Sequence, residues 1–423
     1  MSGVASGRGL VGENRDFRLL FLSTLASSIG TWLAVVALVL DIYDRTSSAA
    51  WVSALLIAEF APLVLIGLLA GPLLDRLPRR RVLIASDLSR AAIFLVLPFA
   101  TSSLQIVLLA LAAGAATSFF RPAVYAGLPN LVSEGELPRA NGLLQAADNV
   151  TLSVGPVLGG LLVAWTGTGP AYVLNSLSFV VSAGLILGIR RSFEEGHVES
   201  EGHWQDLRSG LGLLTRSRAL RTVVVVWAVF MLGSAGVSVA EVVLAKEVFA
   251  AGDAGYGLML GAMGLGIVIG SLAGGSLAVE HGLRGLYAVA LGSMALGVGA
   301  AAAAPNVWVA APLLVFAGLG NGAALVCNAL FIQRGVPDHL RGRAFTVAMS
   351  LSYAALGLGM VVAGPLTDAL GPRDVWALAA VTIAACVPFA LVLARDTSAV
   401  ITPAAGGAPE PVVDTVTASP ERM

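Results

Sequence analysis

Charged residues are scarce in this chain, and long stretches have none. Asp, Glu, Lys and Arg make up 12% of the 423 residues, whereas hydrophobic residues make up 57%. Residues 285–333 form a run of 49 without a charge, and residues 149–189 form another of 41. Because one helix needs about 20 apolar residues to cross a bilayer, each run is long enough to cross twice. The composition argues against a soluble domain and predicts a polytopic membrane protein.

Other absences restrict the chemistry. The chain has no G-x-x-x-x-G-K-S/T loop, so we do not expect transport driven by nucleotide hydrolysis. The four histidines fall in predicted loops without ligand spacing, and Cys327 and Cys386 lie in separate apolar runs, which makes a metal site or a disulfide framework improbable. No paired acids or His/Ser constellation share one depth. We therefore predict no enzyme, no cofactor and no nucleic-acid partner.

The apolar runs predict an all-α fold. They are continuous rather than alternating, which excludes a β-barrel and leaves helices as the elements that satisfy their backbone in lipid. The hairpin turns expected inside the long runs are residues 166–170 and 304–306, which contain Gly, Pro and Asn. Twelve transmembrane helices are predicted, at about 17–41, 51–74, 82–100, 104–126, 141–166, 170–190, 219–245, 255–278, 285–303, 307–332, 343–369 and 374–395.

The basic residues predict the orientation. They are 24 Arg and one Lys. If both termini lie on one side, twenty of them fall on that side, while Arg45, Lys246 and Arg373 fall on the other and two lie within helices. The positive-inside rule then places both termini in the cytoplasm of a multi-pass protein of the cell (inner) membrane.

An internal repeat divides the chain. At an offset of 204 residues, Gly71 matches Gly275, Arg139 matches Arg343, and the same offset holds in the fifth helix. Duplication of a six-helix unit predicts two bundles in the same orientation. The expected segments are a cytoplasmic N-terminal segment 1–16, bundles 17–190 and 219–395, a cytoplasmic linker 191–218, and a disordered cytoplasmic tail 396–423. The linker is expected to hold an interfacial amphipathic helix or to be simply solvated.

Residues 71–81, GPLLDRLPRRR, place one acid and four arginines between two apolar runs. They resemble the G-x-L-x-D-R-x-x-R-R signature of the major facilitator superfamily, and residues 119–129, 140–142 and 340–345 resemble its efflux branch, which includes enterobactin exporters and macrolide efflux proteins. The resemblance covers about 15–395 and implies alternating access by a protein that is usually monomeric. The positions that match the signature are Gly71, Leu73, Asp75, Arg76, Arg79 and Arg80.

The loop is expected to act as a gate. Asp75 is able to face the amino-terminal end of the eleventh helix, near Arg343, where free backbone donors favour an anion. The family resemblance implies that this acid stabilises the outward-facing state. The alternative is that the arginines only fix the topology.

Two features of the first bundle carry further hypotheses. Asp87, Arg90 and Arg121 are expected at similar depth, as a charge cluster with either a structural or a titrating role. In the fifth helix, Gly142 and residues 155–160 resemble the antiporter motif of drug exporters, although Thr151 replaces one expected glycine. Close helix packing is the alternative for this motif, which consists of Gly142, Gly155, Pro156, Gly159 and Gly160.

Acids inside membrane helices are costly and mark candidate proton or substrate sites. Glu59 is expected about 12 Å past the start of its helix. The helix 4 arginine of many proton-coupled exporters is absent, since Ala110 precedes Gly114 in the corresponding pattern, which puts their usual coupling scheme in doubt. The acidic candidates are Glu59, Asp148, Asp41 and Glu241, the last two being possible interfacial residues. Polar candidates, equally able to bond between helices, are Thr31, Trp32, Asn149, Asn321 and Asn328.

These patterns predict a secondary transporter that exports small amphipathic molecules, such as drugs or siderophores, in exchange for protons. Its expected partners are the small-molecule substrate, protons and membrane lipids. Lipid or lysolipid flipping and solute uptake remain alternatives within transport. A transport-inactive scaffold or sensor on the same fold is the alternative of another class.

Overall fold

The computed structural model describes residues 9–69, 77–191, 218–336 and 340–393. Part of the predicted gating loop, nearly all of the linker and the whole tail lie outside these residues. The described chain is helical and contains no strand, which confirms the predicted all-α class.

Twelve helices are long and apolar enough to cross a membrane, the number expected from the sequence. A short α1 (Leu10–Glu13) precedes them, and a π-turn, η4 (Leu244–Val248), extends α10. The long helices are α2 (Arg15–Thr46), α3 (Ala49–Leu69), α5 (Arg79–Val96), α6 (Ser103–Gly127), α7 (Leu137–Thr166), α8 (Thr168–Leu187), α10 (Arg218–Val243), α11 (Gly252–His281), α12 (Leu283–Ala302), α13 (Val307–Gly335), α14 (Arg341–Leu370) and α15 (Pro372–Leu393).

Local sequence accounts for where these helices begin and end. Ser102 and Gln105 form a capping box at the start of α6, and the Asn306 side chain caps α13. Gly167 and Gly371 end α7 and α14 with φ of 78° and 88°, a conformation that glycine adopts without a steric penalty. These two turn glycines lie 204 residues apart, so the repeat offset extends to backbone conformation.

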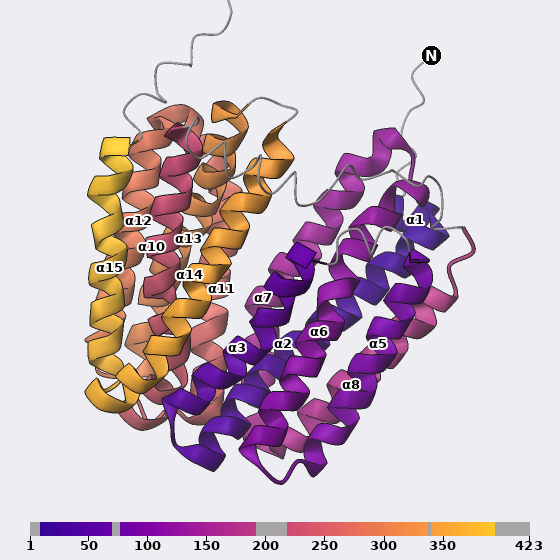
Figure 1. Ribbon diagram of the computed structural model, residues 1–423, viewed down its shortest axis with the longest axis horizontal. Helices are drawn as coiled ribbons and strands as arrows, with labels where there is room; N and C mark the ends of the chain where they lie inside the picture. Colours follow the sequence, from indigo (N-terminus) through magenta and orange to yellow (C-terminus); the bar gives the residue numbers. More distant parts are fainter. Residues whose placement is uncertain (1–8, 70–76, 192–217, 337–339, 394–423) are drawn as a thin grey trace, which may run out of the picture.

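The helices form two bundles, with α2–α8 in one and α10–α15 in the other (Figure 1). The described chain ends lie at the same end of the molecule, here called the terminal face, and the opposite end is called the far face. Across the bundle boundary α7 packs against α11 and α3 against α14. These antiparallel pairs connect the two halves.

Close inter-bundle contacts involve two glycines at equivalent repeat positions. A Cβ at Gly160 of α7 would lie 2.9 Å from the Gly257 Cα of α11, and a Cβ at Gly364 of α14 would lie 2.7 Å from the Ala50 Cα of α3. All four residues belong to the half of their helices nearer the far face. Small residues let helix backbones approach closely, and here they hold the far ends of the bundles together.

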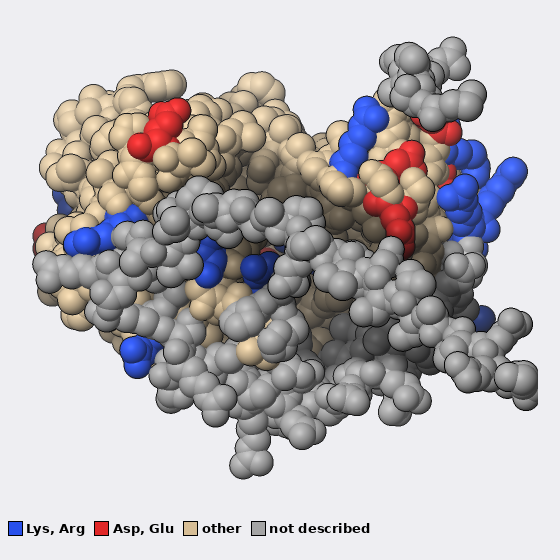
Figure 2. Space-filling model, turned by 90° about the horizontal axis from the view of Figure 1, so that it is seen from above, with Lys and Arg blue, Asp and Glu red and all other residues tan. Residues whose placement is uncertain are grey.

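Toward the terminal face the bundles separate. Figure 1 shows the helices diverging in this direction, and Figure 2, which looks onto the terminal face, shows a hollow between the two bundles. Gly142 and Gly275 lie on the parts of α7 and α11 near this face, and a Cβ added at either position would meet nothing within 4 Å. The structure is thus closed at the far face and open at the terminal face.

Candidate functional site

The described part of the gating loop attaches the start of α5 to its own bundle. Arg79 Nη1 donates to the Ala126 carbonyl at 2.9 Å, and Arg80 donates to the Leu187 carbonyl. Both acceptors lie at carboxyl ends of helices, α6 and α8, where unpaired carbonyls favour cations. The other expected gating residues, Gly71, Leu73, Asp75 and Arg76, lie outside the described residues.

Asp87 and Arg90 form a buried ion pair inside the first bundle. Arg90 Nη2 lies 2.5 Å from Asp87 Oδ1, and Ser182 Oγ donates to Asp87 Oδ2 at 2.7 Å. The guanidinium of Arg90 also lies 4.1 Å from the ring centre of Phe179. Both charges are therefore neutralised by neighbours on α5 and α8, with aromatic contact for the cation.

Arg121 does not join this cluster, contrary to the expectation. Its guanidinium pairs with the Asp148 carboxylate of α7, and Ser28 Oγ of α2 donates to the same carboxylate at 3.3 Å. The Arg121 side chain is 60% exposed, whereas Asp87 is fully buried. Shared depth was a correct basis for expecting a partner, but α6 presents Arg121 toward α7 rather than toward the buried face of α5.

Asp41, near the far end of α2, has a complete set of partners. Arg45 Nε lies 2.7 Å from Asp41 Oδ1, and the Tyr172 hydroxyl donates to Asp41 Oδ2 at 2.9 Å. Arg45 donates in addition to the Ala100 carbonyl. The group ties α2, α8 and the turn after α5 together.

Glu59 and Glu241 differ from these aspartates. Among the residues that the structure describes, neither carboxyl group has a hydrogen bond or an ion pair. Glu59 belongs to α3 and Glu241, 5% exposed, to α10, so each bundle supplies one. Their helices, α3 and α10, both pack against α14 and also contact each other. Two carboxyl groups without a cationic partner thus lie on helices that meet at the boundary between the bundles.

Glu59 is also held by close backbone packing. A Cβ at Gly114 of α6 would overlap the Glu59 carbonyl oxygen and lie 3.2 Å from the Glu59 Cα. Only glycine at this position lets α6 approach α3 so closely. The position of Glu59 in its bundle is therefore set by the close packing of its backbone against α6.

The polar candidates are dispersed. Thr31 donates to the Ser27 carbonyl of its own helix, and Asn149 accepts from Gln145 one turn earlier. Asn328 accepts from the buried Tyr287 hydroxyl at 2.7 Å, while its amide nitrogen is buried without a partner in the described part of the chain. Asn321 is partly buried in α13. Each of the hydrogen bonds named above is to a neighbour within the same bundle.

The glycine motif of α7 lies where three helices meet. A Cβ at Gly155 would lie 2.5 Å from the Trp32 Cβ of α2, and one at Gly159 would lie 3.2 Å from the Leu33 Cα. Gly160 faces α11, as described above, and the carbonyl oxygen of the buried Pro156 fills the space beside Gly257 of α11. Gly142, the first glycine of the expected motif, has no such neighbour. The motif packs α7 against both bundles near the far face.

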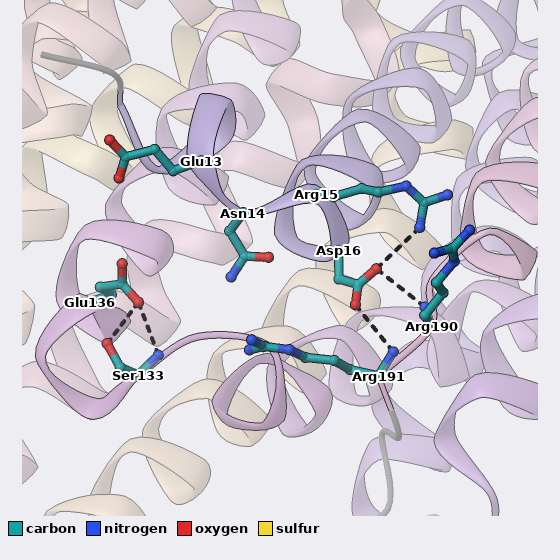
Figure 3. Close-up of a pocket in the computed structure, with 8 residues that line it drawn as sticks. All are labelled: Glu13, Asn14, Arg15, Asp16, Ser133, Glu136, Arg190 and Arg191. Atoms are coloured by element: carbon teal, nitrogen blue, oxygen red, sulfur yellow. Dashed lines mark hydrogen bonds and ion pairs between the residues drawn. The ribbon is translucent and has the colours of Figure 1, made fainter. Parts of the chain in front are cut away.

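A cavity of about 470 Å³ at the terminal face was not anticipated from the sequence. Asp16 accepts from the backbone amides of Arg190 and Arg191 at 3.2 and 3.1 Å, which ties the start of α2 to the chain after α8 (Figure 3). The sequence signal was the charge on three separate segments, 13–16, 134–136 and 190–191. The cavity is lined by Glu13, Asn14, Arg15, Asp16, Ser133, Glu136, Arg190 and Arg191.

Comparison with known proteins adds sequence evidence. A family model described as transmembrane secretion effector matches residues 13–419. The multidrug efflux pump Tap of Mycobacterium tuberculosis is 30% identical over 380 residues, which cover 84% of this chain and 87% of Tap. Macrolide efflux protein A of Streptococcus pyogenes is 20% identical, with 88% and 94% covered.

Solved structures share the fold at low sequence identity. The nucleoside transporter NupG superposes with a TM-score of 0.75 at 11% identity, covering 90% of this chain and 100% of NupG. A bacterial homologue of the human lysosomal transporter Spinster gives a TM-score of 0.72 at 14% identity, with 91% and 97% covered. These matches show the fold, and the predicted superfamily is confirmed by the family model and the efflux relatives.

Proposed function

Because the chain belongs to the transmembrane secretion effector family of major facilitator transporters, we propose that it exports small amphipathic molecules in exchange for protons. Two relatives that match most of the chain have efflux in their names, which supports the direction. The observation that carries the proposal is the pair of carboxyl groups, Glu59 and Glu241, one in each bundle beside the seam between the bundles.

The orientation that we propose follows the distribution of arginine. With twenty of 25 basic residues on the side of the chain ends, the terminal face is cytoplasmic. The state described here is then open to the cytoplasm and closed to the outside. An exporter in this state is ready to take substrate from the cytoplasm or from the inner leaflet, and rocking of the bundles about the seam would expose it outside.

The acids within the helices differ in whether they have an arginine partner. A carboxylate that is paired with arginine has a charged partner, and the pair fixes the helices that carry it. This argues for structural roles of Asp41, Asp87 and Asp148. A carboxyl group without such a partner is able to gain and lose a proton as its exposure to water changes. We therefore assign proton binding to Glu59 and Glu241, with substrate in the hollow on their cytoplasmic side.

The predicted latch at Asp75 belongs to the same proposal. The latch is supported by the signature in residues 71–81. Asp75 itself lies outside the described part of the chain. In the outward-facing state the two bundles must meet at the terminal face, and an acid after α3 would then face the free amides at the start of α14. Asp75 is accordingly proposed to stabilise that state.

The test is proton flux in liposomes. The purified protein is reconstituted, a pH gradient is imposed, and interior pH is recorded while lipophilic drugs and siderophores are added. Substrate-dependent proton movement is expected, and a double variant Glu59→Gln/Glu241→Gln should show none. Insertion of both proteins is checked by protease accessibility of the termini.

If no compound of the panel causes proton flux through the wild-type protein, drug/proton antiport would be contradicted. Fluorescent lipid and lysolipid added to the same liposomes would then separate the alternatives. Movement of lipid between leaflets would indicate flipping, whereas substrate accumulation in the opposite direction would indicate uptake. Inactivity in all of these assays, with correctly inserted protein, would favour a scaffold or sensor.

A further inference from the structure

The far face is closed by polar contacts between the bundles as well as by glycine packing. Asp368, near the end of α14, accepts three hydrogen bonds from the start of α3 in the other bundle. The donors are Ser48 Oγ at 2.8 Å and the backbone amides of Ala49 and Ala50 at 2.7 and 3.1 Å. A residue of one bundle thus caps a transmembrane helix of the other.

This contact suits an acid. The first amides of a helix have no partner within the helix, and the helix dipole adds positive potential at that end. Caps normally come from the residue just before the helix. Here Ser48 occupies that place and donates its hydroxyl to Asp368 instead, so the acid from α14 satisfies two of the first amides of α3, those of Ala49 and Ala50.

Neighbouring contacts fix the same two helices together. Ser53 Oγ donates to the Met360 carbonyl at 2.5 Å, and the Gly364 backbone lies against Ala50. Beside them, Tyr43 donates to Glu247 and Lys246 pairs with Asp44, which joins the end of α2 to η4. Each of these contacts joins residues of the two bundles near the far face, so opening that face breaks all of them.

The cap is not a product of the repeat. Position 164, which is equivalent to Asp368, is Ala, and position 253, equivalent to Ala49, is Asp. The second antiparallel pair, α7 with α11, therefore has the close glycine contact without an acid at the corresponding position of α7. An acid that reaches across to the first amides of the partner helix is thus present in only one of the two equivalent pairs, which indicates a role beyond the shared packing.

We infer that Asp368 is a latch residue that stabilises the state closed at the far face, by capping α3 only while the bundles meet there. The inference relies on alternating access, which is part of the proposed function, and not on proton coupling. Asp368 touches no substrate in this role and acts by setting the balance between the two states of the transporter.

The test measures this balance directly. Spin labels are placed at Gly135→Cys and Gly285→Cys, one per bundle near the terminal face, where a side chain meets nothing within 4 Å. Cys327 and Cys386, both buried, are replaced by Ala in this background. Distances between the labels are measured by double electron–electron resonance in lipid nanodiscs. In Asp368→Ala the ratio of short to long distances should rise roughly three- to tenfold, the range for losing hydrogen bonds to a partly solvated anion.

Two further variants make the result specific. Ser48→Ala removes one of the three donors and should shift the ratio in the same direction by a smaller factor. Asp374→Ala removes an exposed acid from the first turn of α15 at the same face and should leave the distances unchanged. Monodispersity and thermal unfolding are recorded for each variant.

The inference is overturned if Asp368→Ala and Ser48→Ala both keep the wild-type distance ratio, or if Asp374→Ala shifts it as much. If Asp368→Ala misfolds, the distance ratio of Ser48→Ala decides whether the inference holds. Because no substrate or pH gradient is used, failure of the latch is separable from failure of proton antiport. A shifted ratio would support the latch even in a protein that moved no protons in liposomes.

Discussion

At the residue scale, Asp87 and the four acids singled out as proton or substrate candidates fall into two sets. Three of them are aspartates with arginine partners, and each pair joins helices of the first bundle or fixes one turn of it. Two glutamates have neither an ion pair nor a hydrogen bond among the described residues. The paired aspartates are Asp41, Asp87 and Asp148, and the unpaired glutamates are Glu59 and Glu241.

Glu59→Gln should abolish the dependence of transport on the pH gradient, because the amide keeps the size of the side chain but binds no proton. Substrate-driven proton flux in liposomes should fall to about the level of empty liposomes. Glu280→Gln, an exposed position at the terminal-face end of α11, is the matched control and should behave as wild type. An unchanged pH profile in Glu59→Gln would remove this residue from the proton path.

Asp87→Ala should destabilise the protein by about 3–5 kcal/mol, because it leaves the Arg90 guanidinium buried without its counter-ion. Thermal unfolding in detergent measures the loss. The double variant Asp87→Ala/Arg90→Met removes both charges and should recover most of it. If the double variant proved as unstable as the single one, the pair would matter through packing and not through charge.

At the element scale, glycine decides how the bundles meet. Gly160 and Gly364 are equivalent in the repeat, and each lies at a close approach between a helix of one bundle and a helix of the other. The repeat thus accounts for two seams of the same construction, α7 with α11 and α14 with α3. Because α7 and α14 pack so closely against the other bundle, they leave little space for side chains near the far face.

Gly257→Ala should weaken the α7–α11 seam, because the new Cβ would overlap the Pro156 carbonyl oxygen. The expected cost is about 1–3 kcal/mol of unfolding free energy, with loss of most transport activity. Gly275→Ala, on the same helix, adds a Cβ that meets nothing within 4 Å and serves as the control. Equal activity of the two variants would argue against a role for this seam.

At the scale of the whole molecule, closure at one face and opening at the other define a single state of the transport cycle. The far face is held by close backbones and polar contacts, whereas the terminal face has a hollow between the bundles (Figure 2). The number of basic residues on the terminal side makes that face cytoplasmic in our proposal. The outward-facing state requires the reverse arrangement of contacts.

Single cysteines should report this orientation. Thr101→Cys, exposed in the turn before α6 at the far face, should react with a membrane-impermeant maleimide added to intact cells. Gly135→Cys, at the terminal face, should react only after the membrane is opened. The native cysteines are buried and serve as the unlabelled background. The opposite labelling pattern would show that the protein has the inverse orientation in the membrane, which would contradict the proposal.

The sequence was enough to name candidate site residues, whose roles stay predictions, but most of the pairing between them was not predictable. The buried Asp87–Arg90 pair was predictable, because residues three apart on a helix face each other. Arg121 was assigned to the wrong neighbourhood, since its true partner Asp148 comes from another helix. Neither the cap that Asp368 provides nor the anchoring of α2 by Asp16 has a sequence signature, because donor and acceptor lie 320 and 174 residues apart.

The sequence by itself determined the class, the number of helices and the repeat. Charge-free runs of sufficient length have one stable form in lipid, and a glycine at a positive φ ends a helix whatever surrounds it. Only the tertiary structure decided which face is closed, which acids are paired, and which glycines touch the opposite bundle. Those outcomes depend on how six helices rotate and lean against six others, and that arrangement is set by the sum of many weak contacts rather than by any local run of residues.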